Sequence, residues 1–185
     1  MSDFRVASRY AKSLLSLAEE KGVLENVHDD MQLFSSVAEN NKEFTRILKN
    51  PIINHDKKLN ILKAIFKGKV HPLTFSIFEI ITRKNREAIL PTIAKAFHQQ
   101  YNVFNNIEEA KVTTTFPLTE ELRKEFELLV WKYTGKKVDL KEEINESLIG
   151  GFILKIGDQQ IDESLNSKLK ELKLQFSRNP YIKEY

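Results

Sequence analysis

Apolar side chains recur along residues 1–105 at the three-and-four spacing of amphipathic helices. The clearest stripe is formed by Leu24, Val27, Met31, Phe34 and Ala38. Comparable stripes occupy 7–18, 44–48, 59–66, 73–81 and 90–104, and they are separated by helix-ending signals at Gly22, Asn50-Pro51 and Gly68. Six helices with short connections predict a six-helix bundle over residues 1–105.

The fifth of these helices is unusually apolar and has almost no polar face. Its apolar side chains are Leu73, Phe75, Ile77, Phe78, Ile80 and Ile81. Such a helix either runs through the middle of the bundle or leaves one side for another helix to cover. The sequence pattern leaves both interpretations open.

After Asn105 the period of the pattern changes. Residues 110–114 alternate between apolar and polar or hydroxyl side chains, which predicts a strand that Pro117 ends. Thr119 is then placed to cap a helix that closes at Gly135. A strand followed by a helix therefore opens the second part of the chain.

Two further alternating runs, 138–144 and 152–156, are separated by a glycine-containing loop and are interpreted as a hairpin. A last apolar stripe predicts a final helix from about Asp162, and its members are Leu165, Leu169, Leu172 and Phe176. Residues 106–185 are thus predicted to form a small α+β domain of order β-α-β-β-α. The fold class predicted for the whole chain is mainly α, with the six-helix bundle first and the α+β domain second.

The glycines do not form a nucleotide-binding motif. Gly150, Gly151 and Gly157 fail the G-x-G-x-x-G spacing and flank a predicted hairpin strand, whereas the dinucleotide fingerprint needs a strand-to-helix turn. We predict that all three are structural turn residues. Gly135-Lys136 lacks the first glycine and the hydroxyl residue of a phosphate-binding loop and is interpreted as a helix C-cap.

No side chains are grouped in a pattern typical of catalysis or metal binding. Cysteine is absent, and no histidine has a second ligand at zinc spacing. The four histidines, each predicted to lie at the surface or at a helix end, are His28, His55, His71 and His98. We predict no catalytic, cofactor-binding or metal-binding residue. A small hydrolase stays possible only if folding assembles a pocket with perturbed titratable groups.

The charge is uneven along the chain but dispersed. Residues 1–105 carry 16 Lys and Arg against 11 Asp and Glu, a net +5, and the remainder carries 13 against 15, a net −2. The basic excess keeps an RNA-associated helical protein open as an alternative, although the absence of a dense basic run argues against a nucleic-acid partner. The longest apolar run, Leu148 to Leu154, is far shorter than the ~20 residues that cross a bilayer, so we predict no direct membrane insertion.

Three stretches resemble one known family. The segment 9–18, Arg-Tyr-Ala-Lys-Ser-Leu-Leu-Ser-Leu-Ala, resembles the opening of the δ subunit of F-type ATP synthase, the family of the oligomycin-sensitivity-conferring protein. Residues 85–97 are similar to the helix that closes its bundle. The most specific match is 134–140 together with 147–152 and 156–164. The chain departs from the pattern at Leu165-Asn166 and in the tail Ser177 to Tyr185.

The resemblance implies a non-catalytic stator subunit that couples rotation to ATP synthesis, at the cytoplasmic side of the bacterial inner membrane and without a cofactor. It implies that the bundle receives N-terminal helices of the α subunit in a groove between its first and fifth helices. The C-terminal domain would then meet the end of the stalk's b subunit. The residues expected to contact the α-subunit helix are Val6, Tyr10, Leu14, Leu73, Ile77 and Ile81.

Overall fold

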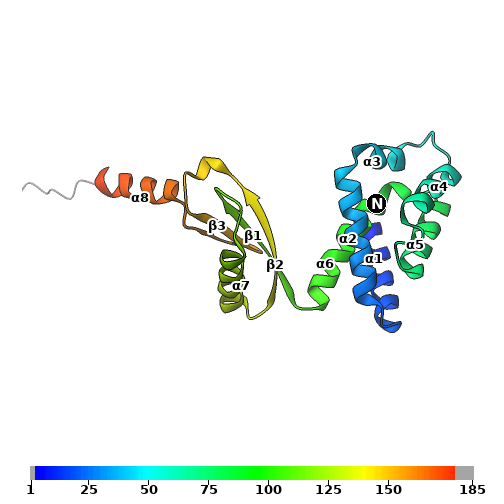
Figure 1. Cartoon of the computed structure of the whole chain (residues 1–185), viewed down its shortest axis with the longest axis horizontal. Helices are drawn as coiled ribbons and strands as arrows, with labels where there is room; N and C mark the ends of the chain where they lie inside the picture. The colour runs from blue at the N-terminus through cyan, green and yellow to red at the C-terminus, as the bar shows by residue number, and fades with distance from the viewer. Residues whose placement is uncertain (1–2, 178–185) are drawn as a thin grey trace, which may run out of the picture. The chain divides into compact units, whose positions relative to one another are not determined.

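The computed structural model describes residues 3–177, and these fall into two compact units that divide between Phe104 and Asn105. The first unit contains six α-helices and a short 3-10 helix, η1 (Glu87–Ile89). The helices are α1 (Asp3–Glu20), α2 (Leu24–Asn40), α3 (Lys42–Lys49), α4 (His55–Phe66), α5 (Pro72–Arg83) and α6 (Leu90–Phe104) (Figure 1).

The helices of the first unit are held together by aromatic rings and by small side chains. Phe34 of α2 lies 5.4 Å from Phe66 of α4 and 5.1 Å from Phe78 of α5, measured between ring centroids. Helix α1 packs mainly against α6, and its fully buried Ala7 and Ala11 let the two backbones approach closely. The apolar stripes of the sequence therefore meet in one core.

Two buried polar contacts join helices of this unit. Lys58 of α4 pairs with Glu87 of η1 at 2.5 Å, and its ammonium also donates to the Leu48 carbonyl at 3.0 Å. Asp30 of α2 accepts hydrogen bonds from the Thr74 hydroxyl at 2.6 Å and from the His71 amide at 2.8 Å. Removing one partner of such a buried pair would leave a charge without compensation, so these contacts fix how the helices meet.

The second unit is a four-stranded sheet with one helix on one face, followed by a further helix. Its elements are β1 (Ile107–Thr114), α7 (Glu120–Thr134), β2 (Lys137–Ile144), the 3-10 helix η2 (Glu146–Leu148), β3 (Phe152–Ile156), β4 (Gln159–Asp162) and α8 (Leu165–Ser177). Helix α7 buries Phe126 and Val130 against Val112 and Leu154 of the sheet. The opposite face carries charged pairs between strands, such as Lys141 with Glu109 at 2.6 Å.

The predicted hairpin between 138–144 and 152–156 is wrong. The strand order is β2-β1-β3-β4, so β1 lies between these two runs and pairs in parallel with β2 and antiparallel with β3. The physical reason is that α7 provides the crossover connection that a parallel pair requires. Alternation identifies a strand but not the strand with which it pairs.

The predicted order β-α-β-β-α also lacks a strand. Strand β4 forms the actual hairpin with β3, and Ile156 faces Gln159 across a two-residue turn at Gly157-Asp158. The strand was missed because it has four residues and Ile161 is its only apolar member. It also moves the start of the last helix from about Asp162 to Leu165.

Candidate functional site

The six residues predicted to contact a docked helix divide into two groups. Val6 and Tyr10 of α1 and Leu73 and Ile77 of α5 are half-buried and keep part of their side chains at the surface. Leu14 and Ile81 are 0% exposed and belong to the core of the bundle. The prediction that these two present their side chains to a docked helix is therefore corrected.

The correction has a geometric cause. Residues four apart are offset by about 40° around a helix, because a turn contains 3.6 residues. Because of that offset, Leu14 and Ile81 belong to the buried core cluster, whereas Tyr10 and Ile77 are only partly buried against it. Of two residues one turn apart on a helix, one can therefore lie at the surface and the other in the core.

The exposed side of α1 lines a pocket of about 430 Å³, and of its lining residues the sequence had predicted only Val6 and Tyr10. Val6, Arg9, Tyr10 and Ser13 contribute to it from α1, and Arg86 contributes from the segment after α5. Arg86 donates a hydrogen bond to the Tyr10 hydroxyl at 3.4 Å. Positions 6, 9, 10 and 13 follow the i, i+3, i+4, i+7 spacing of one helix face, so the signal was present in the sequence. The pocket therefore brings the apolar parts of Val6 and Tyr10 together with two guanidinium groups.

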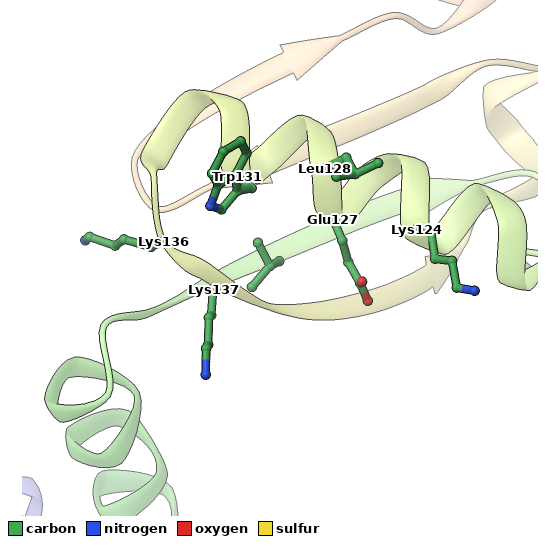
Figure 2. Close-up of a pocket in the computed structure, with 7 residues that line it drawn as sticks. Lys124, Glu127, Leu128, Trp131, Lys136 and Lys137 are labelled. Carbon is green, nitrogen blue, oxygen red and sulfur yellow. The ribbon is translucent and has the colours of Figure 1, made fainter.

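A second pocket, of about 530 Å³, lies on the second unit between α7 and the start of β2. Leu128 and Trp131 are its apolar members on α7, and the indole is 56% exposed. Figure 2 shows three lysines pointing outward around it, and Glu127 also lines it. Its lining residues are Lys124, Glu127, Leu128, Trp131, Lys136, Lys137 and Val138. Lys136 forms an ion pair with Glu108 at 2.8 Å. The pocket is therefore surrounded by both positive and negative side chains.

Helix α8 is a third open surface. None of its residues is buried, and Phe176 is 84% exposed. The tail 178–185, which departs from the family pattern, lies outside the described residues.

Two of the three predicted turn glycines, Gly151 and Gly157, lie where backbone geometry favours glycine. Gly151 has φ +79°, and a Cβ atom there would lie 2.3 Å from the Glu163 carbonyl oxygen. Gly157 has φ +54° in the turn between β3 and β4. Gly150 has no positive φ, and a Cβ atom there would meet only the Leu165 side chain. Gly151 and Gly157 therefore shape the two ends of β3.

One histidine prediction is wrong. His28 of α2 is buried, its ring stacks on Tyr101 with centroids 3.7 Å apart, and its Nε2 lies 3.0 Å from Nδ1 of His98. Burial raises the pKa of the Tyr101 phenol, and the nearby carboxylates of Glu25 and Asp29 raise it further. Among residues 3–177 no group of three His, Cys, Asp or Glu side chains could hold a metal ion. These rings pack α2 on α6.

The chain thus combines a helical bundle with a small α/β unit, and both leave apolar side chains exposed beside charged ones. The sequence profile described as ATP synthase delta (OSCP) subunit matches residues 6–176. The chain belongs to this family.

Individual relatives agree over nearly the whole length. ATP synthase subunit delta of Amoebophilus asiaticus is 45% identical over 97% of this chain and 98% of its own. The Cytophaga hutchinsonii subunit of the same name is 45% identical over 96% and 97%. A chain of the Toxoplasma gondii mitochondrial ATP synthase hexamer superposes with a TM-score of 0.69 at 20% identity, over 94% of this chain and 98% of that one, which supports the fold. No helix in the described part of the chain is long and apolar enough to cross a membrane.

Proposed function

We propose that this chain is a non-catalytic stator subunit of a rotary F-type ATP synthase, which links the catalytic head to the peripheral stalk so that rotation drives ATP synthesis. The observation that carries the proposal is the match to delta subunits over nearly the full length of both chains. A subunit with this role must hold two partners at once and needs no reactive group of its own. The comparisons give no support to the RNA-associated alternative.

The first attachment is to the N-terminal helices of the α subunit. The half-buried Val6 and Tyr10 of α1, with Leu73 and Ile77 of α5, supply apolar contacts. Arg9 and Arg86 would receive an acidic side chain on the edge of the docked helix. An amphipathic helix laid along apolar anchors is a common mode of helix recognition.

The second attachment is between the C-terminal unit and the end of the b subunit. Its support is the amount of apolar surface that this unit leaves open on α7 and α8. We place the protein at the cytoplasmic side of the bacterial cell membrane as a peripheral subunit. Two weak attachments on one chain hold far better than either alone, because the second binding step becomes intramolecular.

The test is purification from detergent-solubilised membranes with an affinity tag on this chain. We expect the α and b subunits to be recovered together with the rest of the ATP synthase. Washing in high salt should leave the apolar attachments intact, whereas binding through phosphate contacts would be lost steeply with salt. Recovery of RNA without ATP synthase subunits would contradict the proposal.

A further inference from the structure

Strand β2 lies at one edge of the sheet. The order β2-β1-β3-β4 gives it β1 as a neighbour on one side and no strand on the other within the described part of the chain. Such an edge presents N–H and C=O groups with which an added strand can pair. β2 has eight residues and β4, at the opposite edge, has four. β2 is therefore the longer of the two edges open to an extended chain.

Charged side chains protect only the second half of this edge. Charges on an exposed edge strand are a common defence against pairing with another chain. Residues 141–143 are all charged, and each forms an ion pair inside the second unit. The pairs are Lys141 with Glu109, Glu142 with Arg123 of α7, and Glu143 with Lys111. The first half of β2, residues 137–140, has no such series of pairs and contains the apolar Val138 and Leu140.

The pocket at Trp131 lies beside this first half of β2. Trp131 and Leu128 line it from α7 and Val138 lines it from β2. The side chains of Trp131 and Leu128 are 56% and 59% exposed. When a peptide adds a strand to a sheet, main-chain hydrogen bonds supply affinity and a pocket for alternate side chains supplies specificity. The open edge and the pocket between β2 and α7 provide both elements.

The two faces of β2 offer different neighbours to an added strand. Val138 and Leu140 are partly buried on the side of α7, where Glu127 also lines the pocket. Lys137 is exposed, and Figure 2 shows it pointing away from α7. Among the described residues Lys137 has no ion-pair partner. An added strand therefore fits with apolar side chains toward α7 and an acidic side chain at the alternate position, beside Lys137.

Other kinds of partner fit this surface less well. A docked helix would leave the N–H and C=O groups of the β2 edge unpaired, because a helix uses its own backbone groups internally. A nucleic acid or an anionic membrane needs a surface of one sign, whereas Glu127 and the paired Glu108 lie among the lysines here. An extended chain of alternating pattern uses both the edge and the pocket.

We propose that the first half of β2 and the pocket at Trp131 bind an extended peptide segment of a partner protein, which adds a fifth strand to the sheet. Its apolar side chains alternate with acidic ones, so that the apolar side chains enter the pocket and an acidic one pairs with Lys137. This site goes beyond the proposed function. The stator role rests on the family match and would stand if the peptide did not bind.

The test uses tryptophan fluorescence of the full-length chain, which reports on this pocket alone because Trp131 is the only tryptophan. The probe is the synthetic peptide Thr-Val-Glu-Phe-Glu-Val-Thr, whose sequence reads the same in both directions. We expect a saturable blue shift of the emission as the peptide covers the indole. A peptide with lysine in place of both glutamates should bind about fivefold more weakly or worse. No saturable response to the glutamate peptide, or equal binding of both peptides, would contradict the proposal.

Three variants locate the peptide on the chain. Leu128→Asp should weaken binding about tenfold, because a charge replaces an apolar wall of the pocket. Lys137→Glu should weaken it about fivefold and should favour the lysine peptide instead. Lys132→Glu is the matched control, since Lys132 is exposed on α7 and does not line the pocket. All three side chains are exposed, and circular dichroism checks that each variant stays folded. Equal loss of binding in Lys132→Glu and Lys137→Glu would contradict the assignment.

Amide hydrogen exchange tests the strand pairing itself. Saturating peptide should slow exchange at alternate residues of 137–140, because their amides become hydrogen-bonded at the open edge. A fluorescence response without this protection would mean that the pocket binds side chains only, which contradicts strand addition. Self-association of the chain in sedimentation equilibrium that the peptide fails to reverse and Lys137→Glu abolishes would assign the edge to a second copy and overturn the proposal.

Discussion

At the residue scale, the proposed α-subunit groove depends on which side chains of α1 and α5 remain at the surface. Tyr10 and Ile77 are half-buried, whereas Leu14 and Ile81 are closed off completely. The same substitution should therefore have different effects at Ile77 and at Leu14. At the surface a new charge disrupts binding, and in the core it disrupts folding.

Ile77→Asp should abolish binding of a synthetic peptide from the α-subunit N-terminus while the chain stays helical. Leu14→Asp should instead destabilise the bundle by about 3 kcal/mol or more, because a charge would replace a fully buried leucine. Ile52→Asp is the matched control, since Ile52 is 89% exposed between α3 and α4. Peptide titration and thermal unfolding separate the effects, and loss of binding in the Ile52 variant would contradict the assignment.

Gly151→Ala should destabilise the second unit by about 1–3 kcal/mol, because a side chain is strained at φ +79° and its Cβ would press on the Glu163 carbonyl. Gly150→Ala should cost less, since its Cβ meets only the Leu165 side chain, which can move. Thermal unfolding of both variants measures the difference. If Gly151→Ala melted at the same temperature as Gly150→Ala, the backbone at Gly151 would have to relax at no extra cost in stability.

At the element scale, the sequence predicted helices and strands better than it predicted their pairing. Helical period located α2 and α5 because their stripes are long, and Thr119 and Gly135 cap α7 as predicted. Strand β4 was missed because four residues cannot show a period, and the β2–β3 hairpin was wrong because pairing depends on the α7 crossover. Which residues of α1 remain exposed could not be predicted from the helical period alone, because this depends on which side of the helix the folded bundle buries.

The stability of the first turn of α8 should depend on pH through the carboxyl group of Asp162. Hydrogen bonds from the Ser164 side chain, the Ser164 amide and the Ser167 hydroxyl lower the pKa of this carboxyl from its usual 3.8. A lowered pKa in the folded state means that the stabilisation is fully present above pH 3.8 and is lost as pH falls through the lower folded value.

Amide hydrogen exchange at the first turn of α8 should therefore accelerate below about pH 4, after correction for the intrinsic rate. Asp162→Asn removes the titrating group and should flatten this dependence, and Asp158→Asn in the preceding turn serves as the control. An unchanged pH profile in Asp162→Asn would show that the carboxylate does not hold the start of the helix.

At the scale of the whole molecule, the two units have separate cores. One apolar cluster contains only residues of α1 to α6 and their connections, and the other contains only residues of the second unit. A fragment of residues 1–105 should therefore fold alone with a cooperative thermal transition. A fragment that binds hydrophobic dyes and melts without a transition would show that the bundle needs the rest of the chain.

As a stator subunit, this chain couples the catalytic head to the stalk. The most direct measurement uses membrane vesicles stripped of the head and of this chain, and records the membrane potential generated by ATP hydrolysis after purified head is added back. We predict that the head alone hydrolyses ATP without building a potential, that wild-type chain restores it, and that Ile77→Asp chain restores much less. A potential of full size without the chain would contradict the account.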